Sequence, residues 1–329
     1  MRSSFVGDVV SEVQSRPAGP PTILFVLGMA RSGTSALTRV LSLCGATLPS
    51  GMVGADKTNQ RGYWEPRECI YLNRKILKRQ GSAWWMPAIL EVDSFGADEY
   101  RAALCSIKRY VATLPIAPLV VIKDPHIVFL ASLWFDAARQ AGFNVATVIA
   151  TRHPTEVIGS LNGAANFRPA HASALWLKAS LLAERNTRGV PRVFVDYGRL
   201  LDDWRREVKR ISVELCIEFD CEDEQAVDTF LTPELRHHQC ASITEHFGNQ
   251  WISRSHDVLC AAAQDKPLNT LALDRIFEEY RSSERAFRSA FDAGRRHSDK
   301  AMTWVLGPAV LKRIMDVQAI VHQHRGTWA

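Results

Sequence analysis

Two glycines five positions apart, Gly28 and Gly33, separate an apolar run from a helical pattern. Glycine lets the backbone curl so that several N–H groups face one point, and the start of a helix adds its positive dipole end. Such a loop binds phosphate or sulfate. The spacing is that of a P-loop, but Thr34 and Ser35 stand where nucleotide triphosphatases carry Lys-Ser/Thr. A cation lies inside the loop instead, at Arg31, which favours an anion bound without magnesium.

A second candidate for anion binding is the pair Arg152 and Ser160, which are eight positions apart. Arg152 ends another apolar run, and the following Pro154 and Glu156 suit the first turn of a helix. A forked guanidinium is well suited to a phosphate dianion, and Ser160 would lie about two turns along the helix. The alternative is an arginine at the sheet edge and a serine on a helix surface.

Lys123 ends a third apolar run, close to Asp124 and His126. A lysine there could neutralise charge on a transferred group, or it could be a solvated strand-end lysine. An imidazole such as that of His126 accepts protons near neutral pH, so His126 is a candidate general base, with a helix N-cap as the alternative. We expect Asp124 to orient Lys123, and His153 to be a turn residue.

Glu65 is the other candidate base, and it follows the aromatic pair Tyr63 and Trp64. Desolvation by aromatic rings raises the pKa of a carboxyl group, which would suit it to accept a proton near neutral pH. The alternative is a surface carboxylate paired with Arg61 or Arg67.

Each polar cluster must be positioned by the element that precedes it, and four short apolar runs are typical of buried parallel strands. Helical patterns separate these runs, so the sequence predicts an α/β fold with a doubly wound parallel sheet flanked by helices. In such sheets ligands bind at the carboxyl ends of the strands. The predicted strands are 22–27, 118–122, 145–150 and 192–195, and the helices between them are 35–43, 127–142, 154–161 and 171–187.

The chain divides into a leader at 1–21 and one domain at 22–329. We expect a parallel-sheet core at 22–240 and a helical C-terminal extension at 241–329, which would close over a substrate. The C-terminal third has helical patterns at 204–215, 273–291 and 310–322, whereas 240–269 has no clear period.

Composition excludes several classes of protein. The balance of 40 Lys plus Arg against 35 Asp plus Glu gives a net charge of +5, too small and dispersed to indicate nucleic-acid binding. No apolar run is long enough for a signal peptide or a membrane span, so we expect a cytoplasmic protein without stable membrane insertion. The sequence does not specify an oligomeric state. Seven cysteines without a CxxC pair indicate neither a disulfide framework nor a zinc site: Cys44, Cys69, Cys105, Cys216, Cys221, Cys240 and Cys260.

The segment Gly-x-x-Arg-Ser-Gly-Thr-Ser at 28–35 resembles the 5′-phosphosulfate loop of sulfotransferases, which use 3′-phosphoadenosine 5′-phosphosulfate (PAPS). Arg at the position of Arg31 is the form found in bacterial and Golgi-type members; cytosolic animal members carry Lys. Arg152 and Ser160 resemble the 3′-phosphate motif of the same family. The resemblance implies a P-loop-like fold, no metal, and PAPS ligands at Arg31, Ser32, Gly33, Thr34, Ser35, Arg152 and Ser160.

The resemblance is weaker in four further segments and covers about 23–238. The Gly-rich late loop of cytosolic members is not evident, and Arg295 and Arg296 are candidates to replace it. Golgi-type and some bacterial members use a Glu after the first helix, which favours Glu65 over His126; cytosolic members place a base His two residues after a Lys, whereas His126 is three after Lys123. The four segments are 62–66, 123–126, 195–197 with a helix at 200–210, and 233–237.

The function that this resemblance implies is transfer of a sulfuryl group from PAPS to a hydroxyl of a small molecule, glycoside or lipid, releasing adenosine 3′,5′-bisphosphate. Arg31 and Lys123 would stabilise charge, and Glu65 or His126 would accept the proton. A P-loop small-molecule kinase and a non-catalytic nucleotide-binding protein are the alternatives. The aromatic pair Trp84 and Trp85 would stack on a planar acceptor or belong to the core.

Overall fold

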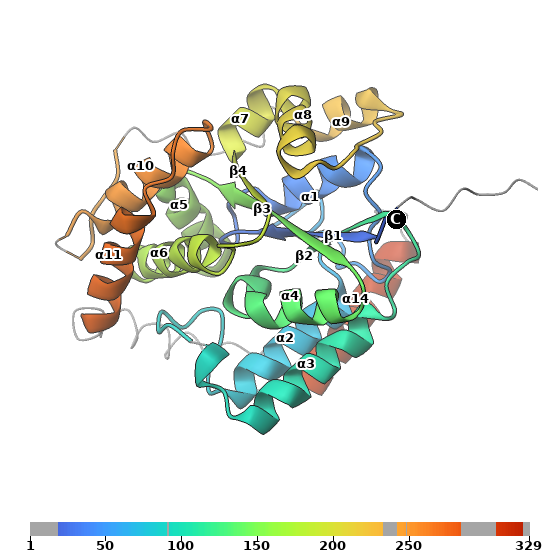
Figure 1. The fold of residues 1–329 in the computed structure, drawn as a ribbon, viewed down its shortest axis with the longest axis horizontal. Helices are drawn as coiled ribbons and strands as arrows, with labels where there is room; N and C mark the ends of the chain where they lie inside the picture. Colours follow the sequence, from blue (N-terminus) through green and yellow to red (C-terminus); the bar gives the residue numbers. More distant parts are fainter. Residues whose placement is uncertain (1–18, 91, 233–241, 248, 284–306, 325–329) are drawn as a thin grey trace, which may run out of the picture.

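The computed structural model describes residues 19–90, 92–232, 242–247, 249–283 and 307–324. Its centre is a four-stranded sheet in the order β2-β1-β3-β4, in which every neighbouring pair is parallel (Figure 1). The predicted α/β fold with a parallel sheet flanked by helices is therefore confirmed. The strands are β1 (Thr22–Leu27), β2 (Leu119–Lys123), β3 (Asn144–Thr151) and β4 (Arg192–Asp196).

The strands are almost wholly apolar because both faces of the sheet are covered. Alternate residues of β1 point to opposite sides: Ile23 and Phe25 enter one hydrophobic cluster, and Leu24 and Val26 enter the other. All four side chains are at most 1% exposed. Burial on both faces fixes the register, since a slip of one residue would exchange the two sets.

One face is covered by α1, α7, α8 and α9, which lie above the sheet in Figure 1. Their apolar residues pack on Leu24, Val26 and the matching residues of β2, β3 and β4. The helices of this face are α1 (Thr34–Leu43), α7 (Tyr197–Asp202), α8 (Trp204–Leu215) and α9 (Glu224–Phe230).

The other face carries the larger hydrophobic cluster, which joins residues from β1 to α11. The last helix, α14, packs on α2 through Leu311, Met315 and Ile70. Elements beyond the first face are α2 (Arg67–Arg79), η1 (Val92–Ser94), α3 (Ala97–Val111), η2 (Pro125–Phe129), α4 (Ala131–Gln140), α5 (Pro154–Ala165), α6 (Pro169–Arg185), α10 (Trp251–Ala262), α11 (Thr270–Ser282) and α14 (Pro308–His324).

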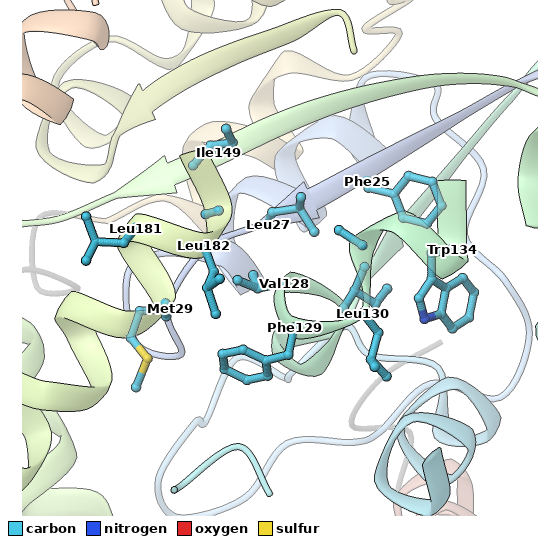
Figure 2. Close-up of a cluster of buried hydrophobic side chains, with 14 of the residues drawn as sticks. Phe25, Leu27, Met29, Val128, Phe129, Leu130, Trp134, Ile149, Leu181 and Leu182 are labelled. Carbon is cyan, nitrogen blue, oxygen red and sulfur yellow. The ribbon is translucent and has the colours of Figure 1, made fainter. Parts of the chain in front are cut away.

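The helix predicted at 127–142 is wrong in its first turn, which is the 3-10 helix η2 followed by a break at Leu130. Asp124 caps η2 by accepting a hydrogen bond from the backbone N–H of His126, at 3.1 Å. The carbonyl of Val128 accepts from the side chain of Asn186 at 2.9 Å rather than from a following helical turn. Figure 2 shows Val128, Phe129 and Leu130 packed among side chains that include Leu27 and Leu182.

Two further helix predictions need correction. The single helix expected at 200–210 is two helices, because Asp203 leaves helical geometry and caps α8 by accepting from the N–H of Arg206 at 3.0 Å. The segment 240–269, in which no period was evident, contains α10. Its buried face includes Ser255 between Ile252 and Leu259, and this polar residue hides the helical period.

Several predictions fall outside the described residues: most of the leader 1–21, the family-like segment 233–237, and Arg295 with Arg296. The pattern predicted at 273–291 begins in α11, which ends at Ser282. Among the described helices, none has the length and hydropathy needed to span a bilayer.

Three buried side chains hold the segment 85–87 against the larger hydrophobic cluster. Each forms a hydrogen bond with one of three consecutive backbone carbonyls; His171 and Lys178 come from α6, and Tyr280 comes from α11. Lys178 is 1% exposed and also lies 4.2 Å from the centre of the Phe129 ring. The bonds are His171 Nε2 to Trp85 O (2.7 Å), Lys178 Nζ to Met86 O (2.7 Å) and Tyr280 Oη to Pro87 O (2.6 Å).

The buried Lys178 predicts a specific pH dependence of stability. Desolvation lowers its pKa from 10.5 to about 7, so the unfolded chain binds a proton more readily than the folded one between those values. The free energy of unfolding should therefore rise between pH 7 and pH 9 by about 2 kcal/mol more in the wild type than in Lys178→Met. Urea denaturation at both pH values measures the difference, with exposed Lys209→Met as the control that keeps the wild-type dependence. Equal slopes for wild type and Lys178→Met would contradict the assignment.

Candidate active site

The loop between β1 and α1 requires both of its glycines. Gly28 has φ +136°, and a Cβ there would lie 2.5 Å from the carbonyl oxygen of Ala150. Gly33 has φ +88°, and a Cβ there would overlap the ring of Tyr197. The backbone therefore passes closely between β3 and α7 and enters α1 at Thr34. This geometry is the strand–loop–helix arrangement that presents backbone N–H groups to an anion.

Arg31 also has positive φ, at 74°, which is uncommon for a residue other than glycine. Its Nε donates to Ser160 Oγ at 2.9 Å, and its Nη2 donates to the carbonyl of Thr58 at 2.9 Å. Arg152 Nη1 donates in turn to the carbonyl of Arg31 at 3.1 Å. The structure thus brings together Arg31, Arg152 and Ser160, which are far apart in the sequence.

Arg152 is 8% exposed and lies directly after β3. Its Nε forms an ion pair of 2.7 Å with Glu156 in the first turn of α5, and its guanidinium carbon is 4.9 Å from the centre of the Tyr197 ring. Glu156 occupies one edge of the guanidinium. An arriving phosphate would share Arg152 with this carboxylate.

Lys123, at the end of β2, is 2% exposed, so the interpretation of a solvated lysine is wrong. Its Nζ donates to Ser35 Oγ at 3.1 Å and to the carbonyl of Tyr63 at 3.2 Å, and it forms an ion pair with Glu65. Lys123 therefore connects the start of α1, after the glycine loop, to the segment that carries Glu65. Its positive charge lies beside the start of α1.

Glu65 pairs with Lys123, so the alternative of a surface carboxylate paired with Arg61 or Arg67 is wrong. Arg67 instead pairs with Asp316 at 3.1 Å, and Arg61 bonds the hydroxyl of Thr232 at 3.1 Å. Burial raises the pKa of Glu65, and the charge of Lys123 opposes this rise.

Asp124 orients His126 rather than Lys123, contrary to expectation. Its Oδ1 lies 2.5 Å from His126 Nδ1, and its Oδ2 accepts from Asn73 Nδ2 at 2.7 Å. Trp134 Nε1 donates to Asn73 Oδ1 at 2.7 Å, which fixes the orientation of the Asn73 side-chain amide. Burial alone would raise the pKa of Asp124, but His126 and these hydrogen bonds outweigh it and hold the pKa below its ordinary value.

His126 Nε2 is buried and has no hydrogen-bond partner among the described residues. In a neutral imidazole, a carboxylate acceptor at Nδ1 favours the tautomer with its proton there, which leaves the lone pair on Nε2. His126 also lines a pocket with Trp84, Trp85 and Arg74. His126 is thus not an N-cap, since Asp124 caps η2, and the residue borders a pocket while its Nε2 is buried.

His153, expected to be a turn residue, precedes α5 at its N-cap position. Its Nδ1 is also without a partner among the described residues, and its ring lies 4.9 Å from that of His256 on α10. Burial lowers the pKa of His256 to about 4, with a smaller electrostatic contribution from the neighbouring His153.

A segment that sequence reasoning missed lies against the glycine loop. Asn59 Nδ2 lies 3.5 Å from Ser35 Oγ, and Asp56 accepts hydrogen bonds from the backbone of Thr58 at 2.7 Å and the hydroxyl of Tyr63 at 2.9 Å. Hydrogen bonds from the backbone N–H groups of Thr58 and Asn59 to the Asp56 carboxylate close a turn at 56–59, which precedes the segment that carries Glu65. Its sequence signal is the Asp-x-Thr-Asn pattern, which is typical of Asx turns.

No family model matches this sequence, and no curated protein matches it. Two solved structures have a distantly similar chain trace. The sulfotransferase domain of the Synechococcus PCC 7002 olefin synthase has 18% identity over 81% of this chain and 97% of its own, with a TM-score of 0.38. Sulfotransferase STF1 from Mycobacterium tuberculosis has 15% identity over 64% of this chain and 72% of its own, also with a TM-score of 0.38. Similarity this distant leaves the functional argument to the site itself.

The described residues contain no group of three or more His, Cys, Asp or Glu side chains placed to hold a metal ion. The charged groups of the site form acid–base pairs and arginine contacts instead.

Gly33→Ala tests whether the loop binds an anion. The added methyl would meet the Tyr197 ring at a φ that an alanine adopts only with strain of about 1–2 kcal/mol. We expect at least a tenfold loss of affinity for adenosine 3′,5′-bisphosphate, measured by calorimetry. Gly163→Ala on α5 is the matched control, because nothing lies within 4 Å of its new methyl. Unchanged affinity in the Gly33 variant would contradict a binding role for the loop.

Proposed function

We propose that this protein is a PAPS-dependent sulfotransferase acting on a hydroxylated small molecule, glycoside or lipid. The observation that carries the proposal is the meeting of Arg31, Lys123 and Arg152 at the carboxyl ends of three neighbouring strands. Parallel sheets bind ligands at this edge, and the three cations there could bind an anion with more than one charged group in exchange for Glu65 and Glu156.

The donor would lie along this edge with its two charged ends apart. The loop from Arg31 to Ser35, with Lys123 beside Ser35, would hold the 5′-phosphosulfate. Arg152 and Ser160 would hold the 3′-phosphate, and their contacts with Arg31 support this arrangement because one cation then borders both sites. Glu156 would move from Arg152 or share it with the phosphate.

His126 is the general base that the geometry favours over Glu65. The Glu65 carboxylate is engaged by Lys123, whereas His126 has a buried accepting nitrogen beside a pocket. Asp124 would hold the ring and stabilise the imidazolium that forms, as a carboxylate does for a catalytic histidine. Glu65 would then serve as the counter-ion of Lys123 until the donor binds.

The reaction balances without a metal or a covalent enzyme intermediate. The acceptor oxygen forms a bond to sulfur as the bond between sulfur and the bridging phosphate oxygen breaks. The acceptor proton passes to His126 Nε2, and the electron pair of the broken bond stays on adenosine 3′,5′-bisphosphate. Lys123 and Arg31 would stabilise that developing charge.

Substitution of each candidate base separates their roles. His126→Asn should lower sulfuryl transfer from labelled PAPS to a panel of phenols and sugars by about 10²–10⁴-fold in kcat, the usual contribution of a general base. Glu65→Gln should retain turnover within tenfold. Calorimetry with adenosine 3′,5′-bisphosphate is the control for donor-site integrity in both variants. Loss of turnover in Glu65→Gln with His126→Asn fully active would contradict the assignment.

A further inference from the structure

The pocket at His126 is walled mainly by apolar and aromatic side chains. Trp84 and Trp85 meet edge to face, with ring centres 5.9 Å apart, and Leu77 of α2 and Leu311 of α14 also line the pocket. The hydrogen bonds to the carbonyls of Trp85 and Met86 hold the backbone from which the Trp85 indole projects. The walls are therefore suited to a planar apolar group.

Arg74, on α2, also lines this pocket and faces no carboxylate partner. The described residues form no ion pair or hydrogen bond with its guanidinium, which lies 5.6 Å from the centre of the Trp85 ring. Burial lowers the pKa of Arg74, and Asp124 is the one charge that opposes this effect. Asp124 cannot serve as a direct partner, because its oxygens already bond His126 and Asn73.

The described residues that line the pocket include no Asp or Glu, so Arg74 meets no carboxylate within this lining. A half-buried guanidinium without a carboxylate carries a desolvation cost that a bound anion would offset. A sulfuryl acceptor with no charge would leave this cost in place.

We propose that this pocket is the acceptor site and selects a hydroxylated ring compound that carries a carboxylate or phosphate. The ring lies against Trp85, the anionic group pairs with Arg74, and the hydroxyl meets His126 Nε2. The assignment rests on the proposed sulfuryl transfer for the role of the hydroxyl, but binding of the anionic group does not depend on turnover.

Matched ligand pairs test the selection. Calorimetry with adenosine 3′,5′-bisphosphate present compares 4-hydroxybenzoate with 4-hydroxybenzamide, and 4-hydroxyphenyl phosphate with 4-hydroxyphenyl acetamide. The wild type should bind each anion at least tenfold more tightly than its neutral partner. Arg74→Gln should abolish this preference while leaving affinity for the neutral partner within twofold. Lys75→Gln, an exposed neighbour on α2, is the control that should keep the preference.

Two outcomes would overturn the inference: equal binding of anion and neutral partner by the wild type, or an unchanged preference in Arg74→Gln. Failure of the proposed function gives a different result. If the anion preference depends on Arg74 but labelled PAPS transfers no sulfuryl group to any of the four compounds, the anionic-ligand pocket stands and the sulfotransferase assignment falls.

Discussion

Buried positive charge at the carboxyl edge of the sheet is the constraint on which the rest of the structure depends. Lys123 and Arg152 are at most 8% exposed; Lys123 is the last residue of β2, and Arg152 directly follows β3. A charge removed from water is costly unless it is paired, and the protein supplies one carboxylate to each, Glu65 and Glu156. The same pairs can be exchanged for an anionic ligand, which makes them suited to a site that binds and releases one.

The scaffold explains why these charges meet. Parallel strands covered on both faces bring all their carboxyl ends to one edge, and the two core clusters leave no freedom of register. The close passage of Gly28 past Ala150, and of Gly33 past Tyr197, then turns the chain sharply into α1. The 3-10 helix η2 positions His126. It buries the residues after β2 against α6 and leaves the His126 ring beside the pocket.

The sequence was informative where a local pattern and a strand end coincide. The four strands and the glycine loop follow from apolar runs and residue spacing, and the same patterns nominated Arg31, Lys123, Arg152 and Ser160. The role of Asp124 was mispredicted because its partner depends on η2, whose first turn looks helical in sequence. Asn73 and Arg74 went unnoticed since both lie on a helix distant in the chain, and their importance comes from tertiary contact alone. α10 was missed because Ser255 interrupts its apolar face.

The central claim is that the edge of the sheet binds a nucleotide by two separate phosphate sites without a metal. Calorimetric titration of the wild type with adenosine 3′,5′-bisphosphate, AMP and ATP, each with EDTA and with Mg²⁺, tests it most directly. The account predicts that the bisphosphate binds about 100-fold more tightly than AMP, as two charge-assisted hydrogen bonds would provide, with no effect of Mg²⁺. Equal affinity for the bisphosphate and AMP, or tight binding of ATP that requires Mg²⁺, would contradict the account and favour a kinase.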